Sequence, residues 1–158
     1  YQMNKQAGFS KDGKRRFWLL RSWENSPKMV LIIGLNPSTA DALYDDPTIE
    51  SCIRLVKNAG FGGFVMCNLF TYITSDPKVL LQNLEDSNRH ESHETLARMM
   101  TNTHLTICAW GSWKFINHRS STVKAMIKEP MCFGINTDGS PKHPLYLKAT
   151  TPIITYVK

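Results

Sequence analysis

The sequence has few cysteines, and their spacing excludes the common cysteine-based sites. Cys52, Cys67, Cys108 and Cys132 are far apart, and no Cys-x-x-Cys pair occurs. A zinc knuckle or a redox dithiol would need such a pair. Three of the four cysteines lie within apolar runs, which predicts buried free thiols in a reducing compartment.

Long apolar runs are also missing. A helix that crosses a bilayer needs about 18 consecutive apolar residues, and no run in this sequence approaches that length. Residues 1–16 lack the apolar core of a signal peptide. Together these absences predict a soluble, cytoplasmic protein that has no membrane partner.

A strong charge of one sign is the third absence. Lys and Arg number 19 against 13 Asp and Glu, which gives a net charge of +6, but the charged residues are scattered along the chain. This mild excess favours an anionic partner, either DNA or a nucleotide. No repeat or low-complexity segment divides the 158 residues, so we expect residues 1–158 to form a single domain and the protein to be a monomer.

Short apolar runs alternate with helical patterns through most of the chain. Strands are predicted near residues 17–20, 29–33, 64–70, 105–110 and 131–135, and helices near 46–60, 77–102 (a pair) and 113–128. This alternation predicts an α/β fold, a three-layer α/β/α sandwich with a mostly parallel central sheet. Residues 1–25 are expected to form a basic segment and an edge hairpin, and residues 24–27 a turn.

The chain is organised around residues 29–41, MVLIIGLNPSTAD. Five consecutive apolar residues without alternation suit a strand that is covered on both faces. After it, Gly34 permits a close approach of the backbone, Pro37 fixes φ, and Ser38 supplies a short hydroxyl. In open α/β sheets, ligands bind at the carboxyl ends of strands where the strand order reverses. Asn36 is therefore the first residue expected to take part in chemistry, although the same stretch also suits a plain turn.

Four loops are expected at the same edge of the sheet, because right-handed crossovers bring the carboxyl ends of parallel strands together. One carries Asn36, a second follows Asn68, a third contains Trp110 and Gly111, and the fourth contains His143. Amides, aromatic rings, an imidazole and glycines would suit a pocket for a flat ring that forms hydrogen bonds. A buried amide such as Asn68 must also find partners.

One histidine pair has a spacing that could suit a metal site. His90 and His93 have i, i+3 spacing, which places two side chains on one helix face. Arg89 and the neighbouring glutamates indicate that this face is solvated. We therefore expect no metal and no cofactor.

Several short motifs follow one another in the order of a known family. They are GLNPSTAD at residues 34–41, DPT at 46–48, the glycine-rich FGG at 61–63, NLF at 68–70, AWG at 109–111 and HPLYL at 143–147. By these motifs the chain resembles a small bacterial and phage family known as domain of unknown function 1643. The resemblance covers nearly all of the chain beyond its N-terminal segment, but the family name implies no chemistry.

The same arrangement is similar to the uracil-DNA glycosylase superfamily. Members that act on mismatched or single-stranded uracil carry Gly-x-Asn-Pro after the first central strand, an asparagine at the end of a later strand, and His-Pro near the carboxyl terminus. These positions are held here by Gly34, Asn36 and Pro37, by Asn68, and by His143 and Pro144. By this resemblance Asn36 would position the attacking water, Asn68 would read the pyrimidine edge, and His143 would stabilise negative charge on the departing base.

This chemistry is consistent with the residue types. Cleavage of an N-glycosidic bond passes through an oxocarbenium-like sugar and is helped most by a fixed donor aimed at the leaving base. A neutral imidazole can donate that hydrogen bond, whereas an asparagine is no base and would only orient water. Phe70, Tyr72 and Tyr44 are candidates to stack on a flipped base. Leu145 and Tyr146 are candidates to wedge into the gap that the flipped base leaves in the duplex.

Two other functions remain open for the same pocket. One is a base-modifying transferase or hydrolase that acts on a hypermodified pyrimidine, as in phage pathways. The other is a catalytically inactive module that binds a nucleic acid or a nucleotide. Asp41, Asp45, Asp46 and Glu50 add negative charge beside the expected site; this charge would repel phosphates, and would suit a cation or a positively charged base.

Overall fold

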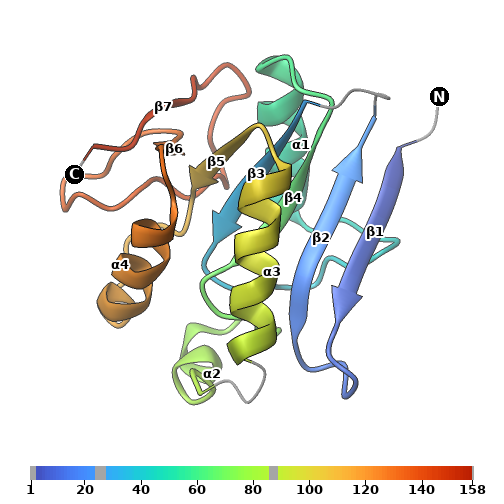
Figure 1. Cartoon of the computed structure of the whole chain (residues 1–158), viewed down its shortest axis with the longest axis vertical. Helices are drawn as coiled ribbons and strands as arrows, with labels where there is room; N and C mark the ends of the chain where they lie inside the picture. The colour runs from blue at the N-terminus through green and yellow to red at the C-terminus, as the bar shows by residue number, and fades with distance from the viewer. Residues whose placement is uncertain (1–2, 24–27, 86–88, 158) are drawn as a thin grey trace.

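The computed structural model describes residues 3–23, 28–85 and 89–157. The turn predicted at residues 24–27 lies outside these ranges. The strands are β1 (Asn4–Phe9), β2 (Arg16–Ser22), β3 (Met29–Gly34), β4 (Gly63–Asn68), β5 (Leu105–Cys108), β6 (Pro130–Cys132) and β7 (Ile154–Thr155). The helices are α1 (Pro47–Asn58), α2 (Pro77–Leu81), α3 (Arg89–Asn102) and α4 (Asn117–Met126). The predicted α/β class is confirmed, since these strands join into one sheet with helices packed on it (Figure 1).

The sheet is mixed rather than mostly parallel, which corrects the prediction. Its order is β1-β2-β4-β3-β5-β6-β7. The central strands β4, β3, β5 and β6 run parallel, while β1 and β2 at one edge and β7 at the other pair antiparallel. β1 and β2 form a hairpin with a short connection, and two strands joined in this way can only pair antiparallel. Apolar runs identify buried central strands but do not set the direction of edge strands.

The strand order reverses at β3. The chain leaves β3 through α1 to β4 on one side, and then crosses through α2 and α3 to β5 on the other side. The carboxyl end of β3 is therefore the switch point at which open α/β sheets form ligand sites. In the parallel register, Gly34 at the end of β3 lies opposite Asn68 at the end of β4.

Helix α1 begins and ends where the sequence predicts. Asp46 is its N-cap and Pro47 its first residue, and the Oδ1 atom of Asp46 accepts a hydrogen bond of 2.8 Å from the backbone N–H of Ile49. This places a carboxylate at the start of the helix, where the orphan N–H groups need an acceptor. The predicted helix pair over residues 77–102 is α2 and α3.

Apolar side chains cover both faces of the sheet. On one face, Val30 and Ile32 of β3 pack in a cluster with Leu55 of α1. On the other face, Leu31 of β3 packs in a cluster with Leu96 of α3, and α3 lies in front of the sheet in Figure 1. All four cysteines are buried and carry free thiols. No helix within the described ranges is both long and apolar enough to cross a membrane.

Candidate functional site

A polar pocket lies at the switch point, between the carboxyl ends of β3 and β4; we call it the Asn68 pocket. It is lined by Arg16, Leu35, Asn36, Ser38, Asp46, Thr48, Ile49, Met66, Asn68 and His143. Its cavity volume is about 30 Å³. This leaves room for one or two waters and is well below the roughly 300–1,000 Å³ of drug-sized ligand pockets. Only one edge of a flat ligand would enter.

Asn68 is the least satisfied side chain in this pocket. The residue is only 5% exposed, and within the described part of the chain neither Nδ2 nor Oδ1 has a hydrogen-bond partner. An unpaired buried amide costs roughly 1–3 kcal/mol. The amide therefore carries an unpaired donor and an unpaired acceptor at the end of β4.

Gly34 is needed because of Asn68. A Cβ atom at position 34 would lie 2.7 Å from Oδ1 of Asn68 and 2.7 Å from Cε of Met66. Ordinary van der Waals contact requires a clearly longer distance. The glycine therefore leaves space for the amide, which gives the predicted close approach at this position a definite neighbour.

His143 presents a neutral imidazole to the pocket. Its Nδ1 atom accepts a hydrogen bond of 3.1 Å from the backbone N–H of Leu145. Burial lowers the pKa of His143 below its usual value of 6.5, and the charge of Asp46 opposes this shift. Near neutral pH the imidazole is thus uncharged, and because Nδ1 is an acceptor, the proton is on Nε2. The side chain is a hydrogen-bond donor at Nε2.

Asn36 links two loops by hydrogen bonds, a role that the sequence did not predict. Its Nδ2 atom donates to the carbonyl oxygens of Thr74 at 2.8 Å and of Tyr72 and Pro37 at 3.1 Å each. These bonds tie the loop after β3 to the loop after β4. Since the amide nitrogen is committed to these carbonyls, only Oδ1 of Asn36 is left to accept a hydrogen bond from a water or a ligand. Ser38 makes a second tie, with a hydroxyl pair of 2.6 Å to Ser75.

Asp46 and Arg16 bring charge into the pocket, and neither was among the predicted site residues. Both carboxylate oxygens of Asp46 accept from backbone, Oδ1 from Ile49 and Oδ2 from Ala40 at 3.2 Å. This carboxylate is a structural cap and is poorly placed to act as a base. Arg16 opens β2 and is buried, with its Nη1 donating to the carbonyl oxygen of Ala40 at 2.9 Å. In the sequence it stands in the basic stretch before an apolar run, where an arginine is typical of the surface.

Two of the predicted ring-binding residues lie at a different pocket. Trp110 is buried and, with Gly111, lines a hollow next to Tyr156 rather than the Asn68 pocket. Gly111 adopts φ 79°, and its N–H donates to the carbonyl oxygen of Pro141 at 3.1 Å. A Cβ at Gly111 would come within 3.4 Å of Cβ of His143. The Ala-Trp-Gly motif therefore packs against the loop that carries His143.

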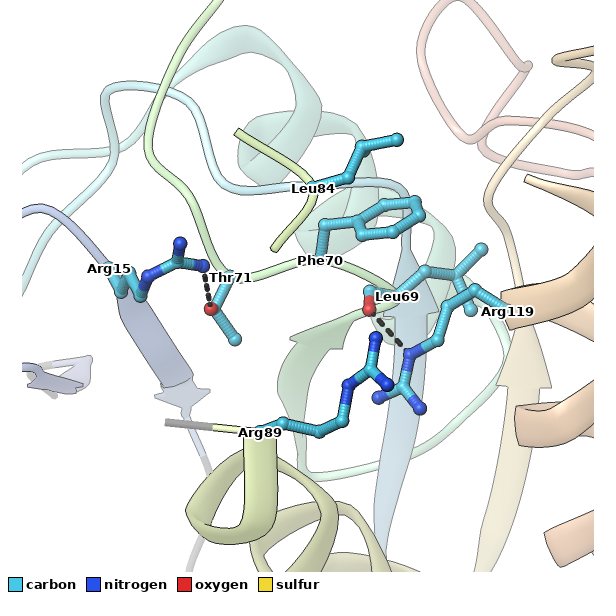
Figure 2. Close-up of a pocket in the computed structure, with 7 residues that line it drawn as sticks. All are labelled: Arg15, Leu69, Phe70, Thr71, Leu84, Arg89 and Arg119. Carbon is cyan, nitrogen blue, oxygen red and sulfur yellow. Dashed lines mark hydrogen bonds between the residues drawn. The ribbon is translucent and has the colours of Figure 1, made fainter. Parts of the chain in front are cut away.

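Phe70 and Tyr72 also lie outside the Asn68 pocket. Figure 2 shows Phe70 at a small separate pocket, where the side chains of Arg15 and Arg119 approach the same stretch of backbone. Arg119 Nε donates to the carbonyl oxygen of Leu69 at 2.9 Å. Arg15 Nη1 donates to Oγ1 of Thr71 at 3.0 Å, and its guanidinium lies 5.5 Å from the centre of the Tyr72 ring. These arginines hold the segment that directly follows Asn68, and so help to fix the position of its amide.

The remaining candidates lie in the loop before α1 and in the loop that carries His143. Tyr44 is 70% exposed and Tyr146 is 91% exposed, so neither ring stacks inside the Asn68 pocket. Tyr146 adopts φ 69°, a left-handed conformation that is uncommon for a residue with a side chain. Pro144 is buried and Leu145 half-buried. Of the predicted residues, the structure brings Asn36, Ser38, Asn68 and His143 together at one pocket, with Gly34 directly below the Asn68 amide.

Fold and pocket define an α/β protein with a polar site at the switch point of a mixed sheet. Over residues 16–145 the chain matches the family described as "Protein of unknown function (DUF1643)", and it belongs to that family. Neither a curated protein nor a solved structure matches the chain. The likeness to uracil-DNA glycosylases stays a prediction that rests on the motif residues.

Proposed function

We propose that the protein is a DNA base glycosylase-like enzyme that hydrolyses the N-glycosidic bond of a uracil-like or modified pyrimidine. The observation that carries this proposal is the unpaired amide of Asn68. One donor beside one acceptor matches the N3–H and O4 edge of a uracil-type ring, since Oδ1 accepts from N3–H and Nδ2 donates to O4. A cavity that admits one edge of a ring suits this pairing.

The reaction assigns one role to each of three side chains. A water oxygen bonds to C1′ of the sugar while the bond from C1′ to the base nitrogen breaks, and the electron pair leaves with the base. Oδ1 of Asn36 orients the water, and Nε2–H of His143 donates to the oxygen on which the base gathers charge. The proton released by the water passes to solvent, from which the base is later protonated. Because Asn36 is no base, the rate depends strongly on how well the base leaves.

The finer features of the fold are part of the same proposal. Apolar clusters on both faces of the sheet suit the three-layer arrangement of the uracil-DNA glycosylases. The net charge of +6 suits a DNA partner. Asp45 beside the site is neutralised by Arg21 at 2.7 Å and Lys5 at 3.1 Å, which reduces the repulsion of phosphates expected from the acidic stretch.

The test is base release from defined oligonucleotides. Single- and double-stranded DNA carrying uracil, hypoxanthine or hydroxymethyluracil is incubated with the protein, and abasic sites are detected by alkaline cleavage. We expect cleavage at a pyrimidine derivative. Hypoxanthine presents N1–H beside O6, the same donor and acceptor that uracil offers to Asn68, so it tests whether the site rejects the larger bicyclic ring. Absence of abasic sites on every substrate would reject the hydrolase.

A second candidate is a nucleobase-binding module that uses the same pocket without catalysis. Asp46, the carboxylate that lines the pocket, is engaged by backbone N–H groups through both oxygens, so it does not supply a general base. Uracil binding that depends on Asn68, together with no base release from any oligonucleotide, would favour this module.

A further inference from the structure

A second polar hollow lies on the other face of the sheet, and we call it the arginine pocket. Leu69, which lines it, packs in the apolar cluster on the face that α3 covers, whereas Met66 of the Asn68 pocket packs in the cluster on the α1 face. The two pockets are therefore separate sites near the carboxyl end of β4. The arginine pocket is lined by Arg15, Leu69, Phe70, Thr71, Leu84, Arg89 and Arg119.

Three cationic side chains meet at this pocket, and none of the described residues that line it is acidic. Arg15 directly precedes β2, Arg89 is the first residue of α3, and Arg119 lies in the first turn of α4. Like charges held around one hollow repel each other and lower the stability of the folded chain. An anion bound among them would offset this repulsion.

Two of the three guanidinium groups are held in place by the chain around the pocket. Arg119 Nε donates to the carbonyl oxygen of Leu69 at 2.9 Å. Arg15 donates through Nη1 to Oγ1 of Thr71 at 3.0 Å and through Nη2 to the carbonyl oxygen of Glu85 at 2.6 Å. A guanidinium that is fixed in advance loses less conformational entropy when a ligand binds.

Arg89 is the member of this group that has no partner. It is exposed, and within the described ranges it forms neither a hydrogen bond nor an ion pair. Figure 2 shows its side chain extending from the start of α3 towards the pocket that Arg119 also lines. The positive end of the α3 dipole lies at the same place. Glu91, the acidic residue in the first turn of α3, lines a different hollow beside Phe17.

The size of the cavity limits what can bind in it. Its volume is about 10 Å³, which holds about one water-sized group. A base ring does not fit. One oxygen of a phosphate does fit, and the other oxygens would lie at the rim, where guanidinium groups pair with phosphate in planar, two-pronged geometry.

We propose that the arginine pocket binds a phosphate group, and that Arg89 is the donor that completes the site. Phosphate is the class of ligand that matches three guanidinium groups around a cavity the size of one oxygen. The choice of a DNA phosphodiester as its source rests on the proposed function, because a strand that reaches the Asn68 pocket carries phosphates on both sides of the base. A free phosphate or a phosphomonoester is the other source of the same chemistry.

The test compares two phosphate probes on the full chain. One is a short fluorescein-labelled strand of oligothymidylate, whose binding is followed by fluorescence anisotropy at a series of salt concentrations. The other is inorganic phosphate, measured by calorimetry. We expect Arg89→Gln to weaken binding of the strand roughly tenfold. The slope of log affinity against log salt should become shallower by about 0.7, the contribution of one phosphate on a single strand.

Variants assign the effect to Arg89. Arg89→Lys should keep part of the affinity, because the charge is retained without the planar guanidinium. Arg98→Gln is the matched control, since it removes the same charge from an exposed position of the same helix, about 13 Å further along the axis. At that separation salt screens most of the interaction, so binding should weaken less than about twofold. Because Arg89 is exposed and unpaired in the described part of the chain, its replacement should leave the melting temperature unchanged.

The two probes identify the source of the phosphate. Dependence on Arg89 with the strand indicates a phosphodiester, and dependence with inorganic phosphate alone indicates a free phosphate or a monoester. Three results would overturn the inference. They are failure of the wild type to bind either probe, binding that Arg89→Gln leaves unchanged, and an equal loss in Arg98→Gln, which would mean that overall charge and not the pocket is responsible.

Failure of the proposed function is recognised separately. If no oligonucleotide releases a base but phosphate binding depends on Arg89, the hydrolase is rejected and the phosphate site stands. If a base is released but binding does not depend on Arg89, the phosphate site is rejected and the hydrolase stands.

Discussion

Strand β2 carries two buried arginines that the fold uses in opposite ways. Arg21 donates hydrogen bonds to the loop before α1, namely to the carboxylate of Asp45 and to the carbonyl oxygens of Asp41 and Tyr44. Arg16, five positions earlier, leaves Nε unpaired among the described residues at the edge of the Asn68 pocket. Asn68 behaves like Arg16, and Asn36, whose Nδ2 makes three bonds, behaves partly like Arg21.

On the proposed function, the paired residues hold the structure and the unpaired residues bind the ligand. A buried polar group that is fully paired contributes to stability, and its loss leaves partners unpaired. A buried polar group without partners lowers stability and persists where function needs it. Substitutions should therefore fall into two kinds. Three substitutions and one change of pH test this division, in order of decreasing expected effect.

Asn68→Ala should abolish function and spare the fold. We expect base release to fall roughly a hundredfold to a thousandfold, because a preorganised donor is removed. The melting temperature should stay the same or rise, since no protein group loses a partner. Single-turnover base release and thermal melting measure the two effects. Asn102→Ala, an exposed asparagine at the end of α3, serves as the control. A large fall in melting temperature would show that Asn68 is structural.

Arg21→Met should have the opposite signature. Removing the guanidinium takes from Asp45 one of its two cationic partners and takes a donor from the carbonyl oxygens of Asp41 and Tyr44, which should cost about 3 kcal/mol in the free energy of unfolding. The measurement is urea denaturation monitored by circular dichroism, with Arg54→Met, an exposed arginine of α1, as the reference. An unfolding free energy within about 0.5 kcal/mol of the wild type would mean that the loop does not depend on this arginine.

Asn36→Ala should combine both signatures. The loops after β3 and β4 lose three hydrogen bonds from Nδ2, so we expect a loss of about 1–2 kcal/mol in stability together with reduced base release. Ser75→Ala, which removes only an exposed hydroxyl pair between the same loops, should change stability by less than about 0.5 kcal/mol. Unchanged stability in Asn36→Ala would show that these bonds are dispensable and that the residue acts on the ligand alone.

Acidification should have the smallest effect. The pKa of His143 lies below 6.5 in the folded chain, so between the two pKa values the unfolded chain holds a proton that the folded chain lacks. Stability is then complete above pH 6.5 and falls as the pH drops through the folded pKa. We expect a fall of no more than a few degrees in melting temperature. His143→Gln should remove this dependence, and the exposed His118→Gln should retain it. A pH profile that His143→Gln leaves unchanged would contradict the assignment.

Local patterns identified the parts of the site that lie on predicted central strands. Asn68 ends an unbroken apolar strand and Asn36 follows another, so the expectation that they lie near each other needed only the parallel direction of those strands. The N-cap at Asp46 was also predictable, because an aspartate followed by a proline and an apolar helical pattern is typical of a helix start. Arg16, Tyr44 and Trp110 could not be placed in this way, since their environment depends on segments distant in the chain.

The sequence by itself determined the α/β class, the central strands, the start of α1 and the side chains that follow β3 and β4, because burial on both faces and helix capping leave periodic and local marks. Only the tertiary structure decided the antiparallel pairing of β2 with β4 and of β7 with β6, the pairing of Arg21 and the unpaired Nε of Arg16. Two arginines on one strand read alike in sequence. What distinguishes them is which backbone carbonyls and carboxylates the fold brings within hydrogen-bonding distance, and this is set by contacts between residues far apart in the chain.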